Sequence, residues 1–254
     1  MRFDIITIFP KIFEPYFNES LLRRAQLKKL LEFHVHYLRD FVDPKDLHRS
    51  VDDRIYGGGP GMLLKVDPLY RAVRTLVLEH PHFFSKKILR NICIEDKKKR
   101  GSRICRVLQK KNSRVRTKIV MLDPRGKIFD QKMAQKFSKF DQIILLSGRY
   151  EGFDARVEKF VDEKISIGKF ILSGGDVAAM TIIEATSRMI PGVLGNKKSL
   201  ENETHNELIK KGVFEGPHYT RPERFFPVEG VRWSVPKILL SGDHEKIQKW
   251  KQKK

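Results

Sequence analysis

The chain has 254 residues, which is enough for one large domain or for a main domain with a small appendage. Lysine and arginine number 51 against 31 aspartate and glutamate residues, so the formal charge is +20 and a polyanionic partner such as RNA is favoured. A solvated basic surface is the plainer alternative, because charge alone does not indicate catalysis.

Cysteine content and hydropathy exclude several classes of protein. Cys93 and Cys105 are the only cysteines, and no His-Cys cluster with zinc spacing accompanies them, so a disulfide framework or a zinc site is disfavoured. No apolar run approaches the length of a membrane span, and the amino terminus lacks a basic leader followed by an apolar core. We therefore expect a cytoplasmic protein that does not act on membranes.

The apolar pattern predicts alternating strands and helices along the chain. Residues 2–9 (RFDIITIF) and 33–38 (FHVHYL) have strand patterns, with a helix at 11–31 between them. A helix at 66–79 follows, then short strands at 119–122 and 143–146 around a helix near 130–140, and an apolar helix at 177–190. Strand-helix-strand order indicates a parallel sheet.

Two further segments are strongly polar. Residues 86–118 contain fourteen lysines or arginines and only two acids, and such runs repel themselves until a polyanion binds. Residues 197–206 (KKSLENETHN) have no strong periodicity and are interpreted as a linker. We expect a main domain at 1–196, a basic insertion at about 86–118, and a short helical region at 207–254 with helices at 207–211 and 244–251.

Residues 51–62 (VDDRIYGGGPGM) are the most informative segment, because two carboxylates and an arginine precede four glycines and a proline. Gly57, Gly58, Gly59 and Gly61 can take positive φ and let backbone amides approach a ligand, while Pro60 limits the looseness. A long surface turn is the alternative interpretation.

Two later segments place charged residues and glycines where strands end. Residues 147–157 (SGRYEGFDARV) follow a buried apolar strand, so Arg149 and Glu151 are expected beyond the carboxyl ends of a sheet, where α/β proteins bind ligands. Residues 166–180 (SIGKFILSGGDVAAM) lead into a helix, with Asp176 as the expected N-cap. Neither a Walker loop nor a Rossmann fingerprint is present.

Together with MLDPRG at 121–126, SRMIPGVLG at 187–195 and GPHYTRPE at 216–223, these segments resemble the bacterial tRNA (guanine-N1)-methyltransferases, the TrmD family. The resemblance implies a SPOUT-type α/β domain with a deep trefoil knot, and an obligate homodimer whose active site lies at the subunit interface. It implies transfer of a methyl group from S-adenosyl-L-methionine to N1 of the guanosine 3′-adjacent to the anticodon, tRNA position 37. The sequence does not establish a need for Mg²⁺.

The resemblance also implies which residues bind the methyl donor. Phe170 stands where the family often has tyrosine, and Ala178 where proline is common. Core packing is the alternative for Ile167, Ile171 and Leu172, and both roles are compatible. The positions matching the family's donor contacts are Leu122, Pro124, Gly148, Ile167, Gly168, Lys169, Phe170, Ile171, Leu172, Gly174 and Gly175.

Guanine N1 carries a proton at neutral pH, so transfer needs a base, and charge that grows on O6 needs a cation. Arg188 matches the family's catalytic arginine; a helix-end cation is its alternative role. Glu203 stands in place of the family's base aspartate, with Glu201 and His205 as competitors. Asp52 is the third expected catalytic residue.

The guanine edge and the RNA need further contacts. Arg149 can donate to O6 and N7, and a carboxylate such as Glu151 can accept from N1-H and N2-H. An Arg149–Glu151 structural pair is the competing view. The expected substrate-binding residues are Tyr56, Gly58, Gly59, Arg149, Glu151, His218, Tyr219 and Arg221, although the last three can also simply pack.

Two other functions remain open from the sequence. One is a catalytically idle RNA-binding relative, and the other is a SPOUT methyltransferase that modifies a different RNA. The replacement of the family's base aspartate by glutamate, the short carboxyl-terminal region and the basic insertion favour these alternatives. The intact glycine segments favour the tRNA enzyme.

Overall fold

The computed structural model describes residues 1–79, 116–195 and 217–252. It divides into two compact units, Met1–Leu194 and Gly195–Lys254. The expected linker at 197–206, the expected helix at 207–211 and the basic segment up to residue 115 lie outside the described residues.

Five strands of the first unit form one parallel sheet. Their spatial order is β2 (Glu32–Tyr37), β1 (Arg2–Thr7), β6 (Gln142–Leu146), β5 (Thr117–Ile128) and β7 (Glu163–Ser166). Every neighbouring pair runs parallel, with Phe3 beside Phe33 on one side and beside Ile143 on the other. The predicted α/β class with a parallel sheet is therefore confirmed, and the carboxyl ends of the strands meet at one edge.

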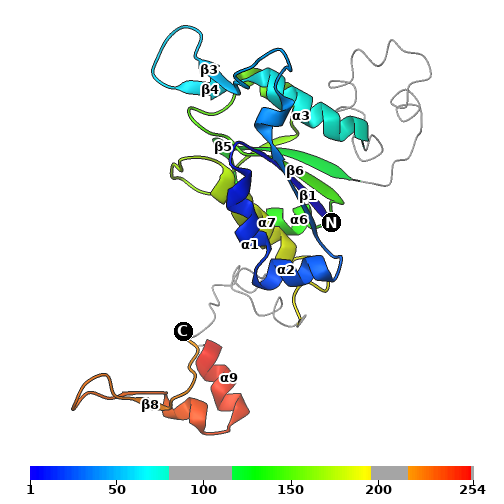
Figure 1. Ribbon diagram of the computed structural model, residues 1–254. Coiled ribbons are helices and arrows are strands. Elements are labelled where there is room, and N and C mark those ends of the chain that lie inside the picture. Colours follow the sequence, from blue (N-terminus) through cyan, green and yellow to red (C-terminus); the bar gives the residue numbers. More distant parts are fainter. Residues whose placement is uncertain (80–115, 196–216, 253–254) are drawn as a thin grey trace. The chain divides into compact units, whose positions relative to one another are not determined.

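Helices cover both faces of this sheet (Figure 1). α3 (Val66–Glu79), η2 (Leu38–Phe41) and η5 (Ala155–Phe160) lie on one face, and α1 (Phe13–Phe17), α2 (Ser20–Leu27), α6 (Gln131–Phe137) and α7 (Asp176–Arg188) lie on the other. Side chains alternate between these faces, so Ile6 packs with α3 whereas Ile5 packs with the second group of helices. The strands are buried on both sides, which explains the continuous apolar run at 143–146.

The single helix predicted at 11–31 is wrong. The chain forms η1 (Pro10–Ile12), α1 and α2 instead, and Glu19 between the two α-helices is extended, with φ −116° and ψ 154°. Phe17 and Leu22 are both buried, but five residues of a continuous helix would turn them about 140° apart. The break lets both side chains reach the same core.

A bulge in β5 shapes the carboxyl edge of the sheet. Leu122 and Lys127 both pair with Ile165 of β7, so residues 123–126 leave the ladder between them. A Cβ at Gly126 would lie 2.4 Å from the backbone nitrogen of Ile165, so the glycine allows β5 to pair with β7 again after the bulge. The strand predicted at 119–122 is therefore longer than expected, and it begins at Thr117, inside the predicted insertion.

The glycine segment is the tip of a hairpin. β3 (Asp52–Arg54) pairs antiparallel with β4 (Met62–Leu64), which the sequence suggests only as a loop. All four loop glycines have positive φ, between 86° and 114°, as predicted. The hairpin contacts the loop after β6, because Glu151 N donates to Met62 O (3.0 Å) and Leu64 N donates to Gly152 O (2.9 Å).

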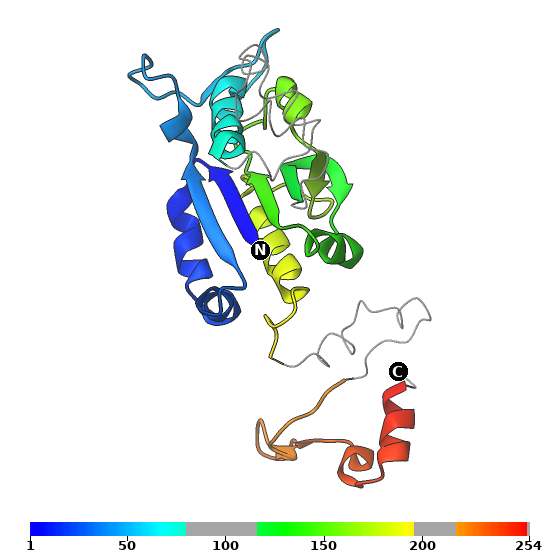
Figure 2. The same ribbon diagram turned by 90° about the vertical axis from the view of Figure 1, so that its right-hand side faces the viewer.

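The second unit contains a short hairpin and a helix, drawn in orange and red in Figure 2. β8 (Arg224–Phe225) pairs with β9 (Trp233–Ser234), and η7 (Lys237–Leu240) precedes α9 (His244–Gln252). The helix predicted at 244–251 is thus confirmed. None of the helices in the described ranges has the length and apolar composition that crossing a bilayer requires.

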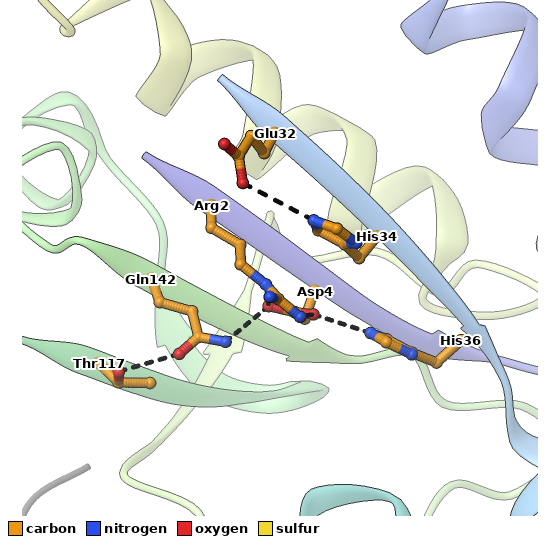
Figure 3. A network of polar contacts seen from close by, with 7 residues as sticks. All are labelled: Arg2, Asp4, Glu32, His34, His36, Thr117 and Gln142. Carbon is orange, nitrogen blue, oxygen red and sulfur yellow. Dashed lines mark hydrogen bonds and ion pairs between the residues drawn. The ribbon is translucent and has the colours of Figure 1, made fainter. Parts of the chain in front are cut away.

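A buried polar network ties four strands of the sheet together (Figure 3). Asp4 accepts from Arg2 Nε (2.8 Å) and Gln142 Nε2 (2.7 Å) and lies 2.8 Å from His36 Nε2, while Thr117 donates to Gln142 (3.1 Å). Burial alone would raise the pKa of Asp4. Hydrogen bonds from His36, Arg2 and Gln142 outweigh it and lower that pKa from 3.8 to about 2.

Candidate active site

A cavity of about 220 Å³ opens at the carboxyl edge of the parallel sheet. Its walls come from the β5 bulge, from the loop after β6, and from the segment that joins β7 to α7. Ligands of open α/β sheets bind outside the carboxyl ends of the strands, so the cavity is where the fold favours a site.

Most of the predicted donor-binding residues line this cavity. Gly168 and Lys169 lie in the same loop without lining it, and a Cβ at Gly168 would meet the Phe170 ring at 2.3 Å. The nine residues that line it are Leu122, Pro124, Gly148, Ile167, Phe170, Ile171, Leu172, Gly174 and Gly175.

The loop after β7 exposes apolar side chains beside the cavity. Phe170 is 54% exposed, Ile171 is 80% exposed and Leu172 is 39% exposed. Core packing, the alternative role considered for Ile171 and Leu172, is therefore wrong, whereas Ile167 packs partly against the core as well as lining the cavity.

Side chains from the ends of β1 and β6 converge on the buried carboxylate of Asp176. The expected N-cap role of Asp176 is wrong, because α7 begins at Asp176 and Gly175 occupies the N-cap position. The side chain is 2% exposed and accepts hydrogen bonds from Thr7 Oγ1 (2.6 Å) and Ser147 Oγ (2.6 Å). Asp176 therefore joins the ends of β1 and β6 to the start of α7.

Arg149 is the third partner of this carboxylate. Its Nε and Nη2 donate to Asp176 Oδ2 at 3.3 and 3.0 Å, and its guanidinium carbon lies 4.4 Å from the Phe9 ring centroid. The structural pair considered for Arg149 and Glu151 is therefore replaced by an Arg149–Asp176 pair, and both Arg149 and Glu151 line the cavity.

Sequence reasoning missed a second arginine–carboxylate pair in the cavity wall. Arg125 donates through Nε (3.0 Å) and Nη2 (2.8 Å) to Asp123, whose side chain is nearly buried. These hydrogen bonds from Arg125 outweigh burial and hold the pKa of Asp123 below its usual value. An Asp-Pro directly after an apolar strand was the available signal, since aspartate there often turns the backbone.

The glycine hairpin meets the cavity through Glu151. A Cβ at Gly61 would lie 2.4 Å from Glu151 Cγ, so the absence of a side chain at Gly61 makes room for Glu151. The other predicted hairpin residues, Asp52, Tyr56, Gly58 and Gly59, do not line the cavity, and the side chain of Tyr56 is 96% exposed.

The predicted catalytic arginine stands apart from the cavity of its own chain. Arg188 is the last residue of α7, and the helix rise puts it about 15 Å from Ala178, the cavity-lining residue of that helix. The base candidates Glu203, Glu201 and His205 lie outside the described residues.

The predicted RNA contacts near the carboxyl end belong to the second unit. Tyr219 is 46% exposed, and its ring centroid lies 6.3 Å from that of Trp250. His218 and Arg221 are exposed. Because Tyr219 contacts another aromatic ring, the alternative role of simple packing fits Tyr219 better than Arg221. Within the described ranges, no group of three or more histidine, cysteine or acidic side chains is arranged to hold a metal ion.

Comparison with known proteins identifies the family. The model for "tRNA (Guanine-1)-methyltransferase TrmD" matches residues 1–91 and 101–254. A tRNA (guanine-N(1)-)-methyltransferase of Dictyoglomus turgidum is 40% identical over 253 residues, covering 100% of this chain and 84% of the relative. A relative of the same name from Mycoplasmopsis synoviae is 40% identical and is covered to 91%, and one from Enterococcus faecalis is 36% identical and is covered to 85%; both alignments cover 100% of this chain. The chain belongs to the tRNA (guanine-1)-methyltransferase TrmD family.

Proposed function

We propose that the protein transfers a methyl group from S-adenosyl-L-methionine to N1 of the guanosine 3′-adjacent to the tRNA anticodon, position 37. The observation that carries this proposal is the cavity at the carboxyl edge of the sheet, which nine of the family's donor-contact positions line in a chain that the family model matches at residues 1–91 and 101–254. The strongly basic composition suits the tRNA substrate, and a tRNA substrate suits work in the cytoplasm.

The cavity walls fit the methyl donor. Phe170, Ile171 and Leu172 expose apolar surface that a flat adenine ring would cover, and Gly148, Gly174 and Gly175 line the cavity without side chains that would fill it. When bound, the donor supplies an electrophilic methyl group on a sulfonium. The task of the protein is to align the guanine N1 behind that methyl, and positioning of this kind lowers barriers by about 7 to 11 kcal/mol.

Arg149 and Glu151, which both line the cavity, are proposed to hold the guanine. Arg149 can donate to O6 and N7, while Glu151 can accept from N1-H and N2-H. Glu203 is proposed to remove the N1 proton, and Arg188 is proposed to stabilise the charge that grows on O6. Tyr56, Gly58 and Gly59 of the hairpin, with Asp52, are proposed to close over the base.

The site is proposed to be shared between two copies of the chain. Arg188 lies too far along α7 for an arginine side chain to reach the cavity of its own chain, so a second copy would have to bring it there. The chain from Gln142 onward, with the loops after β6 and β7, would form the trefoil knot of the SPOUT class, with the donor held there.

Donor binding and methyl transfer test this function. Isothermal titration should detect S-adenosyl-L-methionine binding, and mapping of methylated tRNA should find the modification at N1 of position 37. Leu172→Trp should abolish donor binding by filling the cavity, whereas Leu27→Trp, at a leucine of α2 that is 74% exposed, should not. Equal donor affinity in both variants would remove the cavity from the proposal, and an unmodified tRNA would remove the function.

A further inference from the structure

Arg149 lines the cavity, and three residues from two segments of the chain, Ser173 and Asp176 before and at the start of α7 and Phe9 after β1, hold its guanidinium. Its Nε and Nη2 donate to Asp176, its Nη1 donates to the Ser173 carbonyl (3.2 Å), and its guanidinium stacks on Phe9. The side chain is 24% exposed, against 75% for the guanidinium-bearing side chain of Arg125. Arg149 is thus held more rigidly than an ordinary surface arginine.

This arrangement leaves hydrogen-bond donors for a ligand. An arginine carries five N–H groups, and the hydrogen bonds of Arg149 with other described residues use three of them. Two N–H groups therefore remain on a guanidinium that lines the cavity. A fixed pair of N–H donors matches the O6 and N7 acceptors on one edge of guanine.

Asp176 sets the direction of those two donors. Its Oδ1 is occupied by the hydroxyls of Thr7 and Ser147, so only Oδ2 is left for Arg149. Thr7 is fixed in turn, because its Oγ1 also accepts from Phe9 N (3.0 Å) and Phe9 carries the ring beneath Arg149. The carboxylate, the ring and the guanidinium therefore form one closed unit.

We propose that Asp176 is a positioning residue for methyl transfer, which aims the two remaining N–H groups of Arg149 at the O6 and N7 edge of the target guanine. The inference rests on the proposed function, because it concerns the same reaction. Asp176 does not touch the reacting atoms and acts through Arg149.

Asp176→Asn isolates this role from the structural role of Asp176. The amide oxygen can still accept from Thr7 and Ser147, but the amide nitrogen then faces Arg149 and offers no acceptor to it. The matched control is Asp4→Asn, since Asp4 is likewise a buried carboxylate of the first unit that binds an arginine, at the amino end of β1. Both variants should lose stability, but only Asp176→Asn should slow methyl transfer per folded molecule.

A double-mutant cycle with Arg149→Ala decides the question. In single-turnover methylation of tRNA, Asp176→Asn should slow transfer about 100-fold in the wild-type background, the loss typical of a misplaced group. In the Arg149→Ala background it should change the rate by less than about twofold, the usual scatter of independent sites. Affinity for S-adenosyl-L-methionine, measured by titration, should stay within the same twofold range.

Losses that add in full across the cycle would overturn the inference while leaving the proposed function intact. Loss of donor affinity in Asp176→Asn equal to its loss of rate would also overturn it, because the defect would then be structural. If Asp176→Asn does not fold, Arg149→Lys decides, since lysine keeps the charge without the fork, and a normal rate in that variant overturns the inference. A wild-type protein that methylates no guanosine overturns the proposed function and this inference with it.

Discussion

At the residue scale, glycines in the hairpin differ in what surrounds them. Gly57 and Gly61 both have φ near +87°, but a Cβ at Gly57 would meet nothing within 4 Å, whereas at Gly61 it would overlap Glu151. Backbone strain is therefore the same at the two positions, and only the contact with Glu151 distinguishes them.

This pair gives a controlled test of Glu151 placement. Each glycine-to-alanine change should lower stability by about 1 to 2 kcal/mol, because alanine resists positive φ. Gly61→Ala should also slow methyl transfer between about 10- and 100-fold by displacing the carboxylate. Single-turnover methylation of both variants makes the comparison, and equal rates would show that Glu151 does not need its present position.

At the element scale, the network around Asp4 ties β1, β2, β5 and β6 together. The pKa of Asp4 is lowered from 3.8 to about 2, so the ionised form is favoured in the folded protein. This stabilisation is fully present above about pH 4 and is lost as the pH falls through about 2. A shift of this size corresponds to about 2 kcal/mol.

Urea unfolding between pH 2 and pH 6 tests this contribution. The wild-type free energy of unfolding should fall by about 2 kcal/mol more than that of Asp4→Asn across the acid range, because asparagine does not titrate. Parallel pH profiles for the two proteins would show that the network does not hold Asp4 in its ionised form.

Elements whose pattern is local were predictable from the sequence. The helix at 66–79 has the predicted bounds, because Leu69, Val73 and Leu76 repeat at helical spacing. The β5 bulge was not predictable, since it depends on where β7 pairs and on the close approach of Gly126 to Ile165. The break between α1 and α2 also depends on a shared core.

In the candidate site, too, features with a local sequence pattern were predictable, and features that depend on tertiary contacts were not. Glycines at successive strand ends indicated the cavity, and nine of the predicted donor residues line it. The carboxylates that hold the arginines were missed, because Asp123 and Asp176 meet their partners only through the bulge and the helix start. The pairing of Arg149 with Asp176, 27 residues along the chain, leaves no periodic trace in the sequence.

At the scale of the whole molecule, the basic insertion lies partly inside the sheet. Lys118 belongs to β5 and forms an ion pair with Glu163 at 3.0 Å, so deletion of residues 86–118 would remove part of a strand. The family model leaves only residues 92–100 unmatched, and residues 97–100 are three lysines and an arginine. Replacing these four cations is therefore a better test of RNA binding than deleting residues 86–118.

Replacing residues 97–100 with serine should weaken tRNA binding without changing donor affinity. For every ion pair with a phosphate that the replacement removes, the log-log salt dependence should become shallower by about 0.7 to 0.9 units. Filter binding of tRNA at several salt concentrations measures the slope. An unchanged slope would show that the four cations do not bind the RNA.

The position of Arg188 determines how the shared site can be tested. If a second copy brings Arg188 to the cavity, one chain supplies the donor pocket and the other supplies the arginine. Leu172→Trp damages only the pocket of its own chain, and Arg188→Ala damages only what that chain gives to its partner. Each variant alone should therefore be inactive, but a mixed dimer retains one site with an intact pocket and an intact arginine.

Mixing the two inactive variants, with exchange of subunits, should recover methylation. Random pairing makes half of the dimers mixed, and each mixed dimer has one working site of two, so recovery should approach about one quarter of the wild-type rate per site. A mixture of Arg188→Ala with Glu203→Gln reports where the base acts. Recovery there would place Glu203 and Arg188 on opposite chains of one site, whereas no recovery would place both on the same chain. No recovery in the Leu172→Trp mixture would show that Arg188 acts within its own chain, against the separation along α7.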